Sequence, residues 1–264
     1  MTAQIGAIRA TSEPPPACYF EKAMHRALYA LGSVVAFTVA TAACGIQLTG
    51  GKSSATTDGG TGGSEAGAGD DAGPADKPTL AVTMTQPPAQ VELEKEGILG
   101  WIHWGDGDDV KVFDEKASAP GAIPSFEVTG AKDVLTLHDN FTTFRWTNGT
   151  PKEADTANRT AVYALGQAPS FALQRKVDTP RFHLVVYAGL YRAEGLLRAT
   201  MVAPDGASVS AEATLVNKEK NGYGRFDIAA TGAVLGAKLD VRWEMVGAAD
   251  PDSNITLAAA TLAP

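Results

Sequence analysis

From Thr79 to the end of the chain, apolar and polar residues alternate with a period of two, and Gly, Pro, Asn or Asp interrupts the alternation about every 8 to 12 residues. KLDVRWEMV (238–246) is the clearest case: Leu239, Val241, Trp243 and Met245 share one face, and the charged residues share the other. After residue 78, no window of 11 or more residues has helical periodicity. The pattern predicts an all-β domain, an antiparallel sandwich or barrel, with Trp243 in its core.

Three other stretches extend this prediction. GRFDIAA (224–230) turns Phe226 and Ile228 inward, and NITLAAATL (254–262) is expected to be the last strand. RFHLVVYAGLY (181–191) is apolar on both faces, which predicts a central strand. Its two faces carry Phe182, Leu184 and Val186 on one side and His183, Val185 and Tyr187 on the other.

The N-terminal region has the layout of a secretory signal. Residues 24–45 have a short basic start, an apolar stretch from Ala27 to Ala40, and small residues before Cys44. The apolar stretch is shorter than the roughly 20 residues that a membrane-spanning helix needs. Residues 1–43 are therefore predicted to be a signal region, and the acidic, Pro-rich segment before Met24 suggests that translation starts at Met24.

The residues Thr41-Ala42-Ala43-Cys44-Gly45 resemble the lipobox of bacterial lipoproteins. Only Thr41 departs from the usual Leu. The resemblance implies that Cys44 carries a lipid anchor (diacylglycerol and palmitate), and Gly45 after the cysteine resembles lipoproteins sorted to the outer membrane. An ordinary signal peptide with an incidental cysteine is the alternative.

Residues 44–77 follow as a linker of Gly, Ser, Thr, Ala and Asp. Such a composition buries too little apolar surface to offset its ordering entropy, so a disordered, flexible tether is predicted, and residues 78–264 form the folded domain.

Five stretches of the domain, in this order and spacing, are similar to a β-sandwich module of secreted and surface proteins of bacteria: WIHWG, FRWTNGTP, AVYALGQAPSFALQ, HLVVYAGLYRAEGLLRATMVAPDG and NITLAAATL. The likeness covers about 180 residues, and such modules are described as jelly-roll or carbohydrate-binding-like domains. The resemblance implies a noncatalytic sandwich without catalytic residues or cofactors. Arg192 and Glu194 stand where small or aromatic residues are expected. Whether this chain shares the ligand surface of such modules is therefore left open.

Composition narrows the function further. The formal net charge is −8, which argues against nucleic acid as a partner. The only cysteines, Cys18 and Cys44, precede the domain, so it has no disulfide and no thiol nucleophile. His103, His138 and His183 lie far apart and near no GxSxG elbow or zinc motif. A pair of catalytic carboxylates is not excluded, but the sequence singles none out.

The stretch GWIHWGDGDD (100–109) carries the candidate ligand site. Alternation places Ile102 and Trp104 on one face and Trp101 and His103 on the other. If the first pair packs inward, Trp101 is exposed beside His103 as a flat apolar surface with a polar edge, which suits sugar rings. Tyr191 and Arg192, expected in a loop after the central strand, are candidates for a second contact. The alternative is that Trp101 is covered and fills the core.

No metal is predicted as a required cofactor. Weak calcium candidates are two acidic turns, which comprise Asp106, Asp108 and Asp109 in one and Asp250 and Asp252 in the other. Solvated turns that end strands are the ordinary explanation.

Two functions follow from these observations. The first is a lipid-anchored cell-envelope protein, expected in the outer membrane, whose noncatalytic sandwich binds a carbohydrate or a cell-wall polymer. The alternative is a structural or interaction lipoprotein that docks on another envelope protein and binds no small ligand. An enzyme is not expected.

Overall fold

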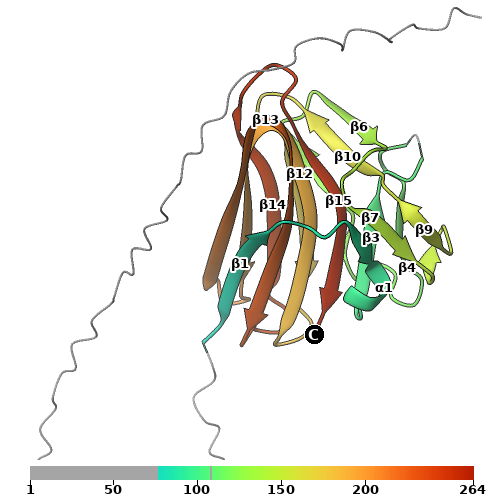
Figure 1. The fold of residues 1–264 in the computed structure, drawn as a ribbon. Coiled ribbons are helices and arrows are strands. Elements are labelled where there is room, and N and C mark those ends of the chain that lie inside the picture. The colour runs from blue at the N-terminus through green and yellow to red at the C-terminus, as the bar shows by residue number, and fades with distance from the viewer. Residues whose placement is uncertain (1–76, 108) are drawn as a thin grey trace, which may run out of the picture. The chain divides into compact units, whose positions relative to one another are not determined.

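The structure, a computed structural model, describes residues 77–107 and 109–264 (Figure 1). The signal region, Cys44, the linker up to residue 76 and Asp108 lie outside the described residues. No helix in the described part is long and apolar enough to cross a membrane. The elements are β1 (Thr79–Thr85), β2 (Gln90–Glu92), α1 (Leu93–Glu96), β3 (Gly100–Trp104), β4 (Phe113–Lys116), β5 (Glu127–Thr129), β6 (Asp133–Leu137), β7 (Thr143–Trp146), β8 (Gly149–Thr150), β9 (Asp155–Asn158), β10 (Ala161–Leu165), β11 (Ser170–Lys176), β12 (Phe182–Val202), β13 (Ser208–Thr231), β14 (Lys238–Ala248) and β15 (Asn254–Ala263).

Two long strands, β12 and β13, form the frame of the fold. They pair with each other along nearly their whole length and bend together near Arg192, where the register shifts and residues 218–220 of β13 have no partner on β12. Before the bend β12 lies between β13 and β15, and after it β12 lies between β13 and β14. One sheet therefore folds over on itself to give the two layers of an antiparallel β-sandwich, which confirms the predicted fold class (Figure 1).

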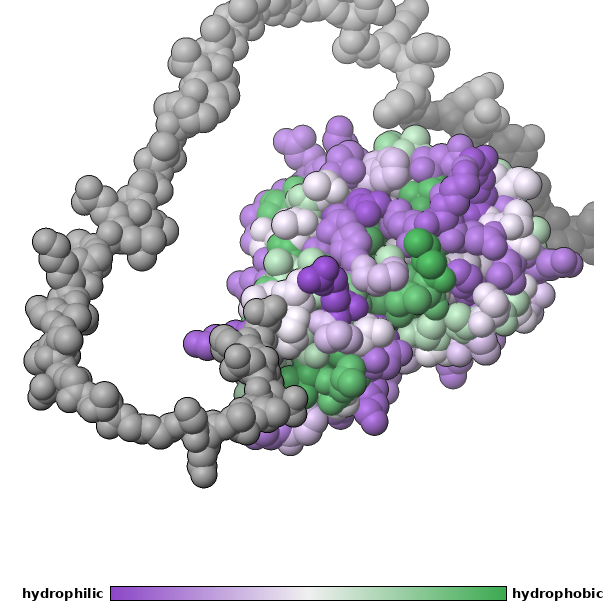
Figure 2. Space-filling view, turned by 90° about the horizontal axis from the view of Figure 1, so that it is seen from below, coloured by the Kyte–Doolittle hydropathy of each residue, from purple (hydrophilic) through white to green (hydrophobic). Residues whose placement is uncertain are grey.

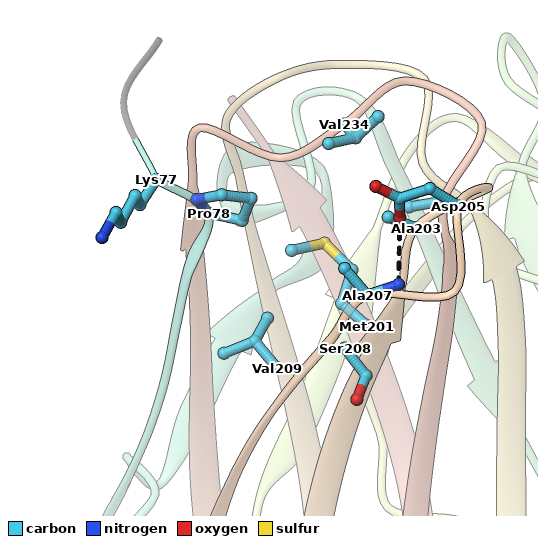
Figure 3. Close-up of a pocket in the computed structure, with 10 residues that line it drawn as sticks. Lys77, Pro78, Met201, Ala203, Asp205, Ala207, Ser208, Val209 and Val234 are labelled. Carbon is cyan, nitrogen blue, oxygen red and sulfur yellow. Dashed lines mark hydrogen bonds between the residues drawn. The ribbon is translucent and has the colours of Figure 1, made fainter. Parts of the chain in front are cut away.

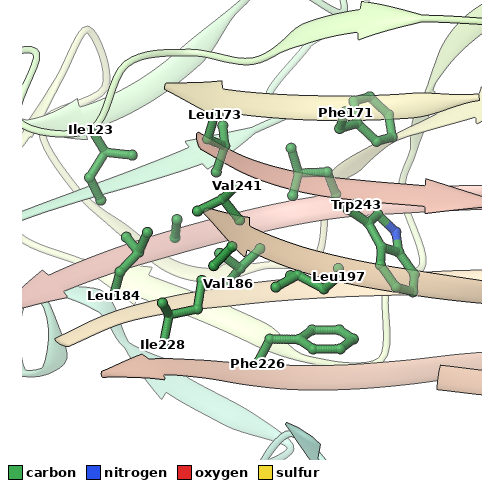
Figure 4. Close-up of a cluster of buried hydrophobic side chains, with 14 of the residues drawn as sticks. Ile123, Phe171, Leu173, Leu184, Val186, Leu197, Phe226, Ile228, Val241 and Trp243 are labelled. Atoms are coloured by element: carbon green, nitrogen blue, oxygen red, sulfur yellow. The ribbon is translucent and has the colours of Figure 1, made fainter. Parts of the chain in front are cut away.

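The main core lies between these two layers. Trp243, Phe226, Ile228, Leu184 and Val186 are all at most 2% exposed, and their side chains point toward one another across the sandwich (Figure 4). Their strand positions are the inward ones that the alternation predicts, so the assignments of Trp243, Phe226 and Ile228 to the core are confirmed. RFHLVVYAGLY is the central strand that its apolar residues on both faces predict, and NITLAAATL is β15.

A second, smaller sheet covers part of the outside of the sandwich. It consists of β2, β7 and β9, and α1 lies beside it (Figure 1). Between this small sheet and the strands β3, β10, β12 and β15 is a second buried cluster, which includes Val91, Leu93, Trp101, Phe144 and Trp146. Trp146 is 2% exposed and belongs to this second core. The outer face of the main sheet is thus divided into a covered half and an open half.

A hydrogen-bonded network fastens α1 to the sheet that it covers. The Glu96 carboxylate accepts hydrogen bonds from the Tyr187 hydroxyl at 2.8 Å and the Thr261 hydroxyl at 2.8 Å, and from Arg225 Nη1 at 2.9 Å. Burial, together with the neighbouring Glu96 charge, raises the pKa of Tyr187. Arg225 also pairs with Asp227, which lies 3.2 Å from His183 Nε2. His183 thus lies next to a structural network of ion pairs and hydrogen bonds.

Candidate functional site

Trp101 and His103 do not form an exposed platform, so the expected exposure of Trp101 is wrong. The two residues share one face of β3, opposite Ile102 and Trp104, as the alternation predicts. That face is covered by the small sheet, and Trp101 is 1% and His103 0% exposed. The Trp101 ring lies 5.4 Å from the Trp146 ring between centroids. A strand in the middle of three layers has no outer face.

His103 is buried in an apolar environment. Its ring lies 5.2 Å from the rings of Phe144 and Trp146, and neither ring nitrogen has a hydrogen-bond partner within the described residues. Burial lowers the pKa of His103 to about 4, with Asp106 as the largest opposing influence. The ring is therefore neutral at physiological pH and is closed to a substrate.

The open half of the outer face carries a cleft of about 250 Å³. Its floor follows from the register: Tyr163 on β10 lies opposite Thr256 on β15, Thr256 opposite Gly189 on β12, and Gly189 opposite Tyr223 on β13. Two positions further along the strands, Asn254, Tyr191 and Asn221 form a second row on the same face. We call this site the tyrosine cleft; its lining residues are Thr136, Leu137, His138, Tyr163, Leu190, Tyr191, Asn221, Tyr223, Asn254 and Thr256.

The cleft combines aromatic faces with amide and hydroxyl groups. Tyr163, Tyr191 and Tyr223 are half-buried, so each presents part of its ring to solvent. The ring of Phe141, which is 42% exposed, stacks on Tyr223 at 5.5 Å between centroids and extends the aromatic surface. Burial raises the pKa of Tyr223, so its hydroxyl is neutral and can donate a hydrogen bond. Gly189 leaves the floor low, since a Cβ there would lie 3.2 Å from the Tyr223 ring.

Of the four predicted ligand-binding residues, Tyr191 is the one that lines the cleft. Tyr191 and Arg192 lie within β12, at its bend, and not in a loop as expected. Arg192 has a φ of 51° and pairs with Asp250, and its guanidinium lies 5.9 Å from the centre of the Tyr191 ring. Arg192 therefore packs beside Tyr191, which lines the cleft, and does not line the cleft itself.

The candidate calcium residues of the described part do not gather around one point. Asp106 lies 3.2 Å from Lys152 Nζ, and the Asp109 carboxylate accepts a hydrogen bond from its neighbour's backbone at Lys111. Asp250 pairs with Arg192 and caps the turn that contains Asp252. Among the described residues there is no group of three His, Cys, Asp or Glu side chains placed to hold a metal ion.

A carboxylate pair that the sequence does not single out lies beside His103. Asp114 is 1% exposed, accepts a hydrogen bond from the Lys152 backbone at 2.9 Å and interacts with Asp106. Burial and the Asp106 charge raise the pKa of Asp114 to about 6. Lys152 Nζ lies between Asp106 and Asp155, at 3.2 and 2.6 Å. The burial of Asp114 closes this pair to a sugar.

Sequence reasoning missed Tyr163 and Tyr223 as site residues. Both tyrosines point away from the core in the alternation of their strands. Val162 and Ala164 beside Tyr163 face the core, and so does Phe226, three residues after Tyr223. Alternation thus predicts two exposed tyrosines. It does not predict that β10, β15, β12 and β13 are adjacent in that order, and the cleft depends on this order.

Comparisons with known proteins give no family assignment. No family model matches the chain, and no curated protein matches it. Solved structures similar to it include TmCBM61 in complex with beta-1,4-galactotriose (15% identity, 52% of this chain and 87% of that chain, TM-score 0.33) and arabinose-bound MgGH51 α-L-arabinofuranosidase (12%, 70% and 31%, 0.34). The enzymatically active domain of bacteriophage CBA120 tailspike protein 4 matches at 14% identity over 53% of this chain and 19% of that chain, with a TM-score of 0.32. TM-scores this low identify no ligand for this chain.

Proposed function

We propose that the chain is a lipid-anchored cell-envelope protein whose noncatalytic β-sandwich binds a carbohydrate or a cell-wall polymer in the tyrosine cleft. The observation that carries the proposal is the cleft itself, where tyrosine rings from three strands surround amide and hydroxyl groups on an open sheet face. Sugars present apolar C–H faces and a rim of hydroxyls, so rings and polar groups at this spacing are complementary to them.

The position of the cleft suits an anchored protein. The linker joins the domain next to Thr79, which pairs with Thr231 at the end of β13. Tyr223 of the cleft precedes Thr231 by eight residues on the same strand. At 3.3 Å per residue the cleft is roughly 26 Å from the level at which the linker joins the domain. A protein attached to a membrane through Cys44 would thus hold the cleft away from the bilayer.

Titration of the full chain in detergent with soluble glycans, and pull-down with insoluble cell-wall polymers, test this function. We expect Tyr191→Ala and Tyr223→Ala each to weaken binding by about tenfold, the upper range for one aromatic contact, at an unchanged melting temperature. Val246→Ala, at an exposed position of β14, is the matched control and is expected to bind like the wild type.

Wild-type binding that both tyrosine variants retain would place the ligand elsewhere. Absence of binding to every glycan would favour the alternative, an interaction lipoprotein that docks on another envelope protein.

A further inference from the structure

We propose that the end of the sandwich at which the linker joins, here called the tether end, docks on the surface of an anionic lipid bilayer. This inference rests on the proposed membrane anchor and goes beyond it, since a flexible linker alone would leave the domain free to point in any direction. The tether end is formed by the start of β1, the loops after β12 and β13, and the turn between α1 and β3.

The register places these segments at one level. Thr79 pairs with Thr231 at the end of β13, and Phe182 at the start of β12 pairs with Ala230. His183 pairs with Ala263, and the backbone of Leu99 donates to the carbonyl of Leu262 at 3.0 Å. The hairpin from Val202 to Ser208 returns to the same level in the second layer, as Figure 1 shows for the lower end of the sandwich.

Large apolar side chains protrude from this end. Ile98 is 61% and Leu235 60% exposed, the two highest fractions among the exposed large apolar residues of the described part. Val234, at 42%, precedes Leu235 in the loop after β13, and Val202, at 39%, is the last residue of β12. Figure 2 looks at this end and shows separate apolar areas within a hydrophilic surface. Side chains so placed can enter the headgroup region of a bilayer together, because they belong to one end of a rigid sandwich.

An apolar cavity of about 380 Å³ opens between the loops. Met201, Val209, Val234 and Pro78 line it, and Figure 3 shows them around the gap between the two layers. The Asp205 carboxylate at its edge is engaged by the backbone of Ala207 at 2.9 Å. The mouth of the sandwich is thus open to apolar groups, such as the upper part of a lipid chain.

The charges around the loops fit anionic headgroups. Lys77, Lys176 and Lys238 are exposed there, and within the described residues none of them forms an ion pair. The acidic Asp178 is paired with Arg175 at 2.8 Å. Free lysines beside protruding apolar residues are the combination by which peripheral proteins bind anionic bilayers. Because the chain as a whole is acidic, its other surfaces would be repelled by such a bilayer.

Depth-dependent quenching tests the proposal. A single cysteine replaces Leu235 or, as the control, Val216, which is 53% exposed in the part of β13 that pairs with Glu194, remote from the tether end. Both are built in the full chain with Cys18→Ser, and the lipid on Cys44 holds both proteins to the vesicles equally and blocks the Cys44 sulfur from the fluorophore. Each carries an environment-sensitive fluorophore, and the phosphatidylcholine vesicles contain nitroxide-labelled lipid with or without phosphatidylglycerol.

We expect several-fold stronger quenching at position 235 than at position 216, enhanced by phosphatidylglycerol and lowered by Lys→Glu changes at residues 77, 176 and 238. Each lysine is expected to contribute a factor on the order of five. Equal quenching at the two positions, or protection of position 235 by added envelope proteins and not by vesicles, would overturn the proposal. Glycan titration and the acylation of Cys44 are measured separately, so failure of the proposed function is distinguishable from failure of docking.

Discussion

At the scale of single residues, Trp101 is a core side chain in this structure. It is 1% exposed and packs on Trp146, and its indole nitrogen has no partner within the described residues. We expect Trp101→Ala to lower the free energy of unfolding by about 3 to 5 kcal/mol, the usual cost of deleting a buried aromatic side chain. Urea denaturation measures this, with Tyr191→Ala as a control that should cost much less. Unchanged stability would show that the small sheet does not cover Trp101.

Two buried groups, His103 and Asp114, act on stability in opposite directions between pH 4 and 6. The pKa of His103 is lowered to about 4, so its contribution is lost as the pH falls from 6.5, where the unfolded histidine takes up a proton. The pKa of Asp114 is raised to about 6, so its contribution is full below 3.8 and is lost as the pH rises through 6. Their effects largely cancel in this window.

Removal of the Asp114 carboxylate should reveal the pH dependence of stability that His103 causes. In Asp114→Asn, the amide oxygen can still accept the hydrogen bond from the Lys152 backbone. The contribution of His103 to the pH dependence of stability is then no longer offset. We expect the free energy of unfolding to fall more steeply than in the wild type as the pH drops from 6 to 4, by up to about 1.4 kcal/mol per pH unit. Denaturant titrations at several pH values measure the slope. Parallel curves for the two proteins would contradict the prediction.

At the scale of elements, the bend of β12 decides the architecture. The sequence pattern places Tyr191 and Arg192 in a loop after the central strand. The strand instead continues to Val202 and exchanges β15 for β14 as its neighbour. The turn between β14 and β15 supports this bend, since Ser253 Oγ donates to the carbonyl of Arg192 at 2.6 Å and accepts from the backbones of Ala249 and Asp250, both at 3.1 Å.

The support at the bend gives a further prediction. Ser253 is 1% exposed, so Ser253→Ala removes three hydrogen bonds that water does not fully replace. We expect a loss of about 2 kcal/mol in the free energy of unfolding. Ser210→Ala, at an exposed position of β13 where the hydroxyl bonds only to Thr200 in the described part, should change it little. Equal effects of the two substitutions in thermal or chemical denaturation would show that the turn does not hold the bend.

At the scale of the whole molecule, the proposed anchor would decide where the domain acts. If Cys44 is acylated, the multiple chains of a lipoprotein hold it stably to the membrane, whereas one chain binds only marginally. We expect wild-type protein to enter the detergent phase in phase separation, and Cys44→Ala to shift toward the aqueous phase. Recovery of both proteins in the aqueous phase would rule out the anchor. Metabolic labelling with a palmitate analogue checks acylation independently of the apolar segment 27–40.

The sequence by itself determined which side of each strand faces inward, because alternation at a period of two reports a strand with one buried face. It therefore predicted the sandwich, the core position of Trp243 and the opposite orientations of Trp101 and Trp104. Whether an outward side chain is exposed depends on what covers the sheet. Trp101 is buried because β2, β7, β9 and α1 lie over it, and Tyr223 is accessible because they end before it. The cleft requires β10, β15, β12 and β13 to be neighbours, and that order results from pairing between segments far apart in the chain, which only the tertiary structure decides.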